Sequence, residues 1–395
     1  MSLNTTPSSE RIQIGFFGKT NTGKSSLINA ITNQNISIVS NISGTTTDPV
    51  TKAMELLPLG PVLITDTAGY NDNSELGKLR LDKTLRVLNK TDIALLIADA
   101  SVGLTDEDKQ IIKIFQDKKI KYIIVYNKCD LIQIPLNQSE NEIYVSALKN
   151  INISGLKEKI ASFNVNFNKT RMLVSDLIKE NYPVILVTPI DSAAPKGRLI
   201  LPQQQVLRGI LDKGGIGIVV KETQLEQSLK YCPSPQLVIT DSQVFKYVNS
   251  ILPRDIPLTS FSILFARYRG ILNIAVKSVK KIKSLKDNDT ILISEGCTHH
   301  KQCDDIGSVK LPFWLKSYTQ KNLNFEFSSG TQFPDNLNKY SMIIHCGGCM
   351  LNENEVLNRF QNAEKYNVPI SNYGITIAYI NGILERSIEI FPELK

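Results

Sequence analysis

The chain has 395 residues, enough for two or three domains of the usual ~100 to 200 residues each. Its net charge of +7 is spread along the chain without dense Lys/Arg runs, so we expect no nucleic-acid partner. No stretch reaches the roughly 18 apolar residues that cross a bilayer, and residues 1–10 lack the apolar part of a signal peptide. Since the six cysteines also lie largely near histidines, we expect a cytoplasmic protein with no membrane partner.

The first motif is a glycine-rich loop between a strand and a helix. An apolar run at 11–17 predicts a buried strand, Gly18-Lys19-Thr20-Asn21-Thr22-Gly23-Lys24-Ser25 follows it, and a helical pattern begins at 26. A P-loop requires this context, because backbone N–H groups and the helix N-terminus bind the phosphates. Lys24 would then reach the β- and γ-phosphates and Ser25 would bind Mg²⁺. The alternative is a Gly-rich turn formed by chance, which the flanking strand and helix argue against.

Two further motifs suit the γ-phosphate and its metal ion. Gly44-Thr45-Thr46-Thr47-Asp48 lies in a polar segment that predicts a loop, where a threonine can close on Mg²⁺. An apolar run at 62–65 predicts a strand that ends in Asp66-Thr67-Ala68-Gly69. Asp66 would complete the Mg²⁺ shell, and Gly69 could approach the γ-phosphate.

The base-binding motifs follow two more predicted strands. The strand at 123–126 ends in Asn127-Lys128-Cys129-Asp130, and the strand at 143–145 ends in Ser146-Ala147-Leu148. Asp130 can accept hydrogen bonds from the N1 and 2-amino groups of guanine, a pattern that adenine lacks. The predicted nucleotide is therefore GTP. The residues predicted to bind it and its metal are Gly18, Asn21, Thr22, Gly23, Lys24, Ser25, Ser26, Asp66, Asn127, Lys128, Asp130, Ser146 and Ala147.

Because these motifs occur in order and at the expected spacing, residues 10–165 resemble the GTPase family that contains Era and MnmE. The resemblance implies that Asn21 accompanies K⁺-stimulated hydrolysis and that Thr46 is the switch threonine. Tyr70 stands where Ras-like enzymes have a glutamine that positions water, so we expect slow turnover. The predicted catalytic residues are Lys24, Ser25, Thr46, Asp66 and Gly69.

After a loose stretch at 164–171, interpreted as a linker, a second α/β pattern begins. It predicts strands at 183–188, 217–220 and 236–240, a helix at 203–211 and a helix at 242–251 capped by Asp241. The polar stretch 189–205 does not follow this periodicity. It is either a long surface loop or a functional or interface loop.

A third segment carries most of the thiols. It begins with an amphipathic helix at 272–285, and helices are also predicted at 313–321, 353–366 and 374–384. Apolar runs at 290–294 and 341–344 predict strands that deliver thiols at their carboxyl ends. The cysteines and histidines in these two stretches are Cys297, His299, His300, Cys303, His345, Cys346 and Cys349. Cys129 and Cys232 are interpreted as ordinary small buried residues.

The spacing Cys346-Gly347-Gly348-Cys349 predicts a metal or redox site. Two thiolates can converge on one soft metal, and the glycines let backbone N–H groups approach sulfur. Open α/β sheets bind ligands outside the carboxyl ends of their strands, so we expect one site formed by both stretches. Two alternatives stay open here. One is a tRNA-modification or ribosome-assembly GTPase with zinc on Cys297, His299, Cys346 and Cys349, and the other is a nucleotide-gated interaction module with merely buried cysteines.

The pair Cys297-Thr298-His299 and, after 45 intervening residues, His345-Cys346-Gly347-Gly348-Cys349 resemble the HydF family. These proteins are the GTPases among the maturation proteins of FeFe hydrogenase. The GTPase motifs and the stretch 189–205 share in the resemblance, which covers the whole chain. It implies an α/β chain of three domains, a P-loop GTPase domain (1–168) followed by two smaller α/β domains, for dimerisation (169–266) and for iron–sulfur cluster binding (267–395).

The HydF resemblance also implies cofactors and partners. A 4Fe-4S cluster would bind Cys297, Cys346 and Cys349, beside GTP, Mg²⁺ and K⁺. The protein would be a homodimer that works with radical-SAM maturation proteins as scaffold and carrier, and it would deliver a di-iron precursor to apo FeFe-hydrogenase. The fourth cluster ligand stays open among His299, Cys303, Asp304, Asp305, His345 and an exogenous group.

Overall fold

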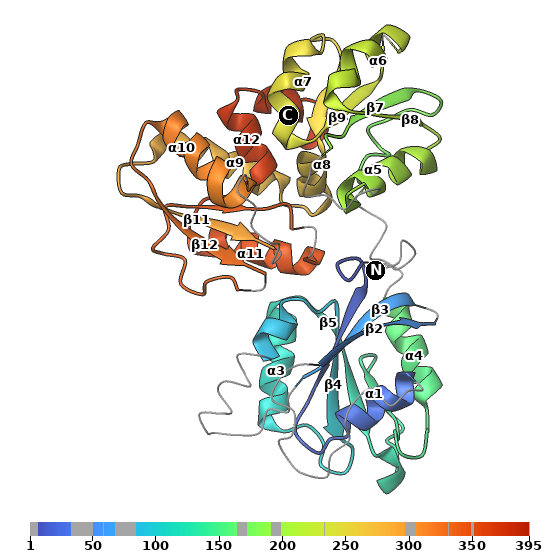
Figure 1. Ribbon diagram of the computed structural model, residues 1–395. Helices are drawn as coiled ribbons and strands as arrows, with labels where there is room; N and C mark the ends of the chain where they lie inside the picture. Colours follow the sequence, from blue (N-terminus) through green and yellow to red (C-terminus); the bar gives the residue numbers. More distant parts are fainter. Residues whose placement is uncertain are drawn as a thin grey trace. The chain divides into compact units, whose positions relative to one another are not determined.

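The computed structural model describes residues 7–32, 50–57, 59–67, 84–163, 172–190, 199–232, 234–296, 305–330, 332–348 and 351–394 (Figure 1). The chain folds into two compact units, Met1–Lys169 and Thr170–Lys395. None of the helices within the described ranges combines the length and the apolar composition needed to span a bilayer.

The first unit is built on a six-stranded sheet in the order β2-β3-β1-β4-β5-β6. Neighbouring strands are parallel except β2, which is antiparallel to β3. The strands are β1 (Ile12–Phe17), β2 (Val50–Leu56), β3 (Gly60–Asp66), β4 (Ile93–Asp99), β5 (Lys121–Asn127) and β6 (Glu142–Tyr144). The helices are α1 (Lys24–Thr32), α3 (Asp106–Asp117) and α4 (Ile153–Ser162), with the 3₁₀ turn η1 (Cys129–Leu131) between β5 and β6.

Both faces of this sheet are covered, and two consecutive phenylalanines show why. Successive side chains of a strand point to opposite faces. Phe16 packs in the cluster that contains residues of α1 and α4, whereas Phe17 packs in the cluster of α3, with its ring centroid 5.5 Å from that of Phe115. The apolar run of β1 is therefore continuous, as expected for a parallel strand buried on both sides. Figure 1 shows the helices on the two faces of the sheet.

The second unit contains two four-stranded parallel sheets. The first has the order β10-β9-β7-β8, and its elements are β7 (Pro183–Val187), α5 (Leu201–Asp212), β8 (Ile216–Val220), η3 (Glu222–Gln224), α6 (Leu225–Tyr231), β9 (Leu237–Thr240), η4 (Ser242–Val244), α7 (Phe245–Ile251), β10 (Leu258–Ser260) and α8 (Phe261–Tyr268).

The second sheet of this unit has the order β12-β11-β13-β14. Its elements are α9 (Leu272–Val279), η5 (Lys280–Ser284), β11 (Thr290–Glu295), η6 (Ile306–Lys310), α10 (Leu311–Thr319), β12 (Asn324–Ser329), β13 (Met342–His345), α11 (Glu353–Lys365), β14 (Ile370–Asn372), α12 (Tyr373–Ile380), α13 (Leu384–Ile388) and η7 (Pro392–Leu394). The two strands that precede the thiols, β11 and β13, are direct neighbours.

The two sheets of the second unit share one hydrophobic core, which extends from Val174 to Phe391. The chain returns to the first of these sheets through α13. The hydroxyl of Thr259, in β10, donates to the carbonyl oxygen of Ser387 at 2.9 Å. The buried guanidinium of Arg386 donates to Asn249 Oδ1 at 2.9 Å and to the carbonyl oxygens of residues 252, 253 and 256.

The α/β fold class, with a P-loop GTPase domain followed by two smaller α/β layers, is confirmed. Some local expectations were wrong. The stretch 189–205 is not one loop, because α5 begins at Leu201 and the buried Gln203 accepts a hydrogen bond from the N–H of Ile200. The predicted helix at 272–285 is α-helical only to Val279, and the helix predicted at 374–384 ends at Ile380, with the separate helix α13 beginning at Leu384.

Candidate functional site: nucleotide-binding loops and a thiol turn

The glycine-rich loop joins β1 to α1, and its glycines occupy positions that other residues would not fit. Gly18 has φ +147° and Gly23 has φ +86°, both in the region that favours glycine. A Cβ on Gly18 would overlap the carbonyl oxygen of Ile97, and one on Gly23 would overlap the amide nitrogen of Asn127. Asn21 also has a positive φ, 65°, which asparagine tolerates better than most residues.

Lys24 lies at the start of α1, folded back onto the loop. Its ammonium group donates to the carbonyl oxygens of Gly18 and Lys19, at 2.7 Å each. Burial lowers the pKa of Lys24 to about 8, against the opposing effect of Asp66 and Asp108. An incoming phosphate would offer this cation a better partner than two carbonyl oxygens.

Ser25 and Asp66 are brought together by the neighbouring ends of α1 and β3. The Ser25 hydroxyl donates to Asp66 Oδ2 at 3.0 Å. The next residue, Thr67, fixes the end of β3 to β1, since its hydroxyl donates to the carbonyl oxygen of Phe16 at 2.6 Å. A hydroxyl and a carboxylate at this separation are the hard oxygen ligands that Mg²⁺ prefers.

Asn127 connects the phosphate-binding loop to the base-binding loops. Its side-chain amide donates to the carbonyl oxygen of Thr22 at 2.9 Å, and its Oδ1 accepts from the N–H of Ala147 at 3.0 Å. Ser146 is fully buried beside it, and its hydroxyl accepts from the N–H of Lys149. Asp130 lies exposed in η1, the turn that follows β5.

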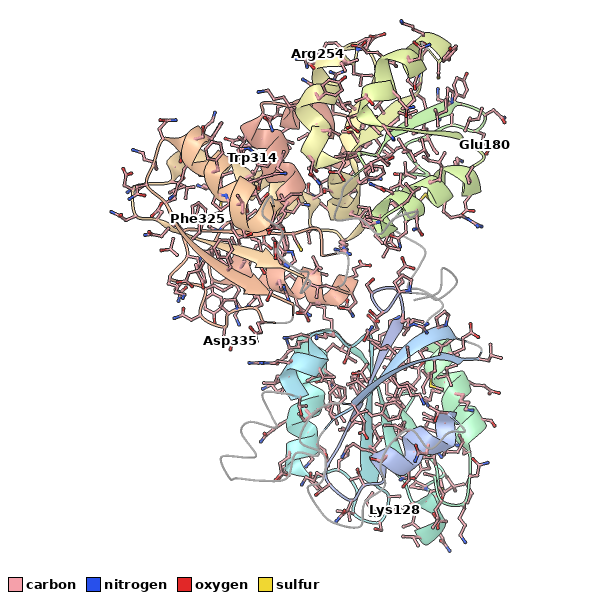
Figure 2. The ribbon with its side chains drawn as sticks, in the orientation of Figure 1. Lys128, Glu180, Arg254, Trp314, Phe325 and Asp335 are labelled. Carbon is pink, nitrogen blue, oxygen red and sulfur yellow. The ribbon has the colours of Figure 1, made fainter. Side chains whose placement is uncertain are left out.

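Lys128 has the left-handed backbone φ of 64°, and its ammonium group contacts Asp99 Oδ2 at 2.7 Å. This pairing lowers the pKa of Asp99 against the opposing effect of burial. Asp99 ends β4, and sequence reasoning did not single it out, although a carboxylate at a strand end was the available signal. Figure 2 labels Lys128 in the lowest part of the first unit as drawn.

The structure thus gathers the described members of the predicted nucleotide site at one end of the sheet. These are Gly18, Asn21, Thr22, Gly23, Lys24, Ser25, Ser26, Asp66, Asn127, Lys128, Asp130, Ser146 and Ala147. Thr46, Gly69 and Tyr70 lie outside the described residues. Their catalytic roles stay predictions, as do the ligand roles of the others.

Cys346 follows β13 and sits beside the end of β11. Its N–H donates to the carbonyl oxygen of Ser294 at 2.8 Å, which continues the sheet by one residue. Its sulfur accepts two backbone N–H groups, from Gly296 at 2.9 Å and from Gly348 at 3.2 Å. Such donors stabilise a thiolate, and hydrogen bonds to cysteine sulfur are a feature of iron–sulfur sites.

Close packing of glycines makes this arrangement possible. A Cβ on Gly296 would lie 3.1 Å from the Cα of Gly348 and 2.9 Å from the side chain of Leu351. Gly348 has φ +62°, and a Cβ there would lie 3.0 Å from Val356. Gly347 differs, because a Cβ there would have no atom of the described residues within 4 Å. Among the described residues, a side chain would therefore be crowded at Gly348 but not at Gly347.

His345 is fully buried, and both of its ring nitrogens are engaged. Nε2 lies 3.1 Å from the guanidinium of Arg359, which can only donate, so Nε2 accepts. Nδ1 then carries the proton and donates to the carbonyl oxygen of Cys346 at 2.7 Å. Arg359 is itself held by Glu355 at 2.9 Å, one turn earlier in α11. In this geometry neither nitrogen of His345 offers a lone pair to a metal.

A second arginine reaches the turn from α8. The guanidinium of Arg269 donates to the carbonyl oxygen of Gly347. At the end of β11, the hydroxyl of Tyr373 donates to Glu295 Oε1 at 3.3 Å. Burial is the main cause that raises the pKa of Tyr373, with Cys346 and Glu295 adding to it. Sequence reasoning did not single out Arg269, Tyr373 or Glu295.

Within the described ranges, no group of three or more His, Cys, Asp or Glu side chains could hold a metal ion. Cys297 and Cys349 lie outside those ranges, as do His299, His300, Cys303 and Asp304. The expected ligand set is therefore represented by Cys346 alone, and its surroundings fit a cluster thiolate. Of the two cysteines interpreted as buried, Cys129 is buried, but Cys232 is only half-buried.

Three family models match the chain. Residues 13–128 match the 50S ribosome-binding GTPase model, residues 173–270 match the hydrogen maturase F dimerization domain, and residues 273–390 match the hydrogen maturase F tetramerization domain. The two maturase models together span more than half of the chain. The segments matched by the two maturase models meet close to the end of α8.

Curated relatives match the GTPase part. The GTPase Der of Wolinella succinogenes is 36% identical over 174 residues, 40% of this chain and 37% of that protein. The tRNA modification GTPase MnmE of Desulforamulus reducens is 35% identical over 150 residues, 38% of this chain and 32% of that protein. The chain thus spans about a third of the length of these relatives. The solved structure of Era from Aquifex aeolicus is 19% identical with a TM-score of 0.34, covering 60% of this chain and 97% of that one, too low to carry an argument.

The maturase models account for the two sheets of the second unit, and the GTPase model accounts for the nucleotide-binding loops of the first. The chain belongs to the hydrogen maturase F family, with an N-terminal P-loop GTPase domain.

Proposed function

We propose that this protein hydrolyses GTP and serves as scaffold and carrier in the maturation of FeFe hydrogenase. It would bind a 4Fe-4S cluster on Cys297, Cys346 and Cys349, receive a di-iron precursor and deliver that precursor to the apo-hydrogenase. Radical-SAM maturation proteins would be its other partners. The observation that carries the proposal is the Cys346 turn, where two backbone N–H groups point at one sulfur at the carboxyl ends of β11 and β13.

The hydrogen bonds of Lys24, Ser25 and Asp66 support the chemistry that we propose for the GTPase site. Lys24 would leave its two carbonyl partners for the β- and γ-phosphates, and Ser25 and Asp66 would take Mg²⁺ between them. Thr46 would close on the metal, and Gly69 would approach the γ-phosphate. Asn21 would bind K⁺. Because Tyr70 replaces the water-positioning glutamine, hydrolysis would be slow without a partner.

The cluster would supply an iron that no cysteine holds, where the cargo could dock. The chain's part is to keep Cys346 as a thiolate through the N–H groups of Gly296 and Gly348. His345 would hold the turn, not the iron, because Arg359 occupies its only lone pair. The fourth ligand then falls to His299, Cys303, Asp304, Asp305 or an exogenous group.

Metal analysis of the anaerobically purified protein tests the cluster. We expect iron and acid-labile sulfide in the wild type, their loss in Cys297→Ser, Cys346→Ser and Cys349→Ser, and their retention in Cys303→Ser. Zinc in place of iron would instead support a structural zinc site, as in a tRNA-modification or ribosome-assembly GTPase.

Hydrolysis assays test the nucleotide half separately. We expect GTP but not ATP to be turned over, with Mg²⁺, and faster in K⁺ than in Na⁺. Lys24→Ala should abolish hydrolysis and leave the iron content unchanged, since the two sites lie in separate compact units. Equal rates in K⁺ and Na⁺ would remove the potassium site from the proposal.

A further inference from the structure

The turn that presents Cys346 is held by residues from two parts of the chain. Within the segment of the tetramerization model, His345 donates to the carbonyl oxygen of Cys346 and is fixed by Arg359. Arg269 belongs to the segment of the dimerization model, and it donates to the next carbonyl oxygen, that of Gly347. The carbonyl groups of Cys346 and Gly347 are therefore both oriented by arginines. Arg269 contacts the second directly, and Arg359 acts on the first through the imidazole of His345.

Arg269 is positioned for this contact by its own helix. Its N–H donates to the carbonyl oxygen of Phe265 at 3.0 Å, and its guanidinium lies 5.8 Å from the centre of the Phe265 ring. Gly270, with φ +73°, then turns the chain away into α9. Arg269 is 7% exposed, so its charge is held largely away from bulk water.

The turn is shaped to admit this guanidinium. A Cβ on Gly348 would lie 2.9 Å from an Arg269 nitrogen, so the glycine and the arginine fit each other. Gly348 is also one of the two N–H donors to the Cys346 sulfur. A change at Arg269 would therefore reach the sulfur through a single peptide unit.

We propose that Arg269, a side chain of the dimerisation segment, is a positioning residue for the thiol turn and adds positive charge beside the cluster. Residues around metal ligands commonly tune metal affinity and potential. Through Arg269, the geometry of the cluster turn depends on the α8–α9 corner. The charge part of this inference rests on the cluster proposed above, whereas the positioning part does not.

The test compares Arg269→Met with Arg269→Lys in the full chain. Arg208→Met is the control, because Arg208 is an exposed arginine of the same segment that pairs with Asp212. In the metal-free protein, hydrogen exchange of peptides covering 342–348 should speed up several-fold in Arg269→Met. Arg269→Lys keeps a donor and the charge and should fall between Arg269→Met and the wild type. The control should match the wild type.

In the reconstituted protein, iron should pass to a chelator about ten-fold faster or more in Arg269→Met. The reduction potential should fall, because the reduced cluster loses a neighbouring positive charge, and Arg269→Lys should keep the wild-type potential. If Arg269→Met does not fold, Arg269→Gln replaces it with the same expected direction. Exchange and iron release equal to wild type in a folded variant would overturn the proposal. Absence of iron from the wild type would contradict the proposed function instead, and exchange would still decide the positioning role.

Discussion

At the scale of single residues, one amide side chain connects the phosphate-binding and base-binding loops of the nucleotide site. Asn127 binds the backbone of the phosphate loop through Thr22 and the backbone of the base loop through Ala147. It can do so because Gly23 has no side chain to displace it. The affinity for GTP should therefore depend on the absence of a side chain at Gly23, besides the predicted contact of its backbone with the nucleotide.

Gly23→Ala should lower the affinity for GTP about ten-fold or more. The left-handed backbone costs ~1–2 kcal/mol with a Cβ, and the lost Asn127 hydrogen bond adds about 1 kcal/mol, where ~1.4 kcal/mol is ten-fold. Titration with a fluorescent guanine nucleotide measures the effect. Gly103→Ala is the matched control, because Gly103 has φ +78° with open space around its missing Cβ. An equal loss of affinity in both variants would contradict the argument.

Lys24 makes nucleotide binding dependent on pH. Burial holds its pKa at about 8 in the free protein, and phosphate would raise it. Below pH 8 Lys24 is charged in both states and the affinity is constant. Above pH 8 the free protein loses this proton, binding must restore it, and the affinity falls by up to about ten-fold per pH unit. Calorimetry at pH 8.5 in two buffers of different ionisation enthalpy should show proton uptake that is absent at pH 7. No uptake at pH 8.5 would contradict this.

The structure brings predicted site residues together where their motif is local in the chain. Lys24 and Ser25 follow from a motif whose strand, loop and helix are consecutive in the chain. Arg269 and Arg359 could not be found in this way, because they act on residues 78 and 14 positions away. Their contacts exist only after the sheets have formed.

At the scale of elements, the turn between β13 and α11 distinguishes its two glycines. Gly348→Ala should lose metal and lower the melting temperature, since the backbone penalty of ~1–2 kcal/mol adds to crowding against Arg269 and Val356. Gly347→Ala should behave like the wild type, because a methyl group there has no atom of the described residues within 4 Å. Metal content per chain and thermal unfolding of the metal-free protein measure both. Similar losses in the two variants would contradict this distinction.

Prediction of elements succeeded where the apolar pattern was strong. The buried strands β1, β5, β7, β11 and β13 were all expected from continuous apolar runs. β12 was missed because Asn324-Phe325-Glu326-Phe327 alternates at the edge of its sheet and carries as much polar as apolar character. Phe325, labelled in Figure 2, packs against the core from this edge. The ammonium group of Lys316 lies 5.7 Å from the centre of its ring. A strand with only one packed face gives a weaker signal than a buried one.

At the scale of the whole molecule, the dimerization and tetramerization models indicate self-association. The described part of the dimerisation segment has an apolar edge strand that suits such self-association. β8 is the last strand of its sheet, and it exposes Ile216 by 51% and Val219 by 40%. Exposed apolar edge strands pair readily with another chain unless charges prevent it.

Ile216→Lys combined with Val219→Lys should therefore raise the dissociation constant of the dimer about ten-fold or more. Light scattering of the full chain over a concentration series measures it. Leu136→Lys is the control, because Leu136 is a fully exposed leucine of the first unit. Unchanged association in the double variant would place the interface elsewhere. The domain boundaries at 168 and 266 stay predictions, and the shared core of the second unit makes the full chain the right material for this test.

The contact between β10 and α13 also has a consequence for the order of events during synthesis. Thr259 meets its partner Ser387 only when 128 further residues have been made, and Arg386 reaches residues 249–256 across a similar interval. Until the ribosome has passed residue 387, the sheet of the dimerisation segment lacks its closing helix. By then the thiol-bearing sheet has been translated as well. Nascent chains thus complete this segment only after the residues of the thiol turn have been made.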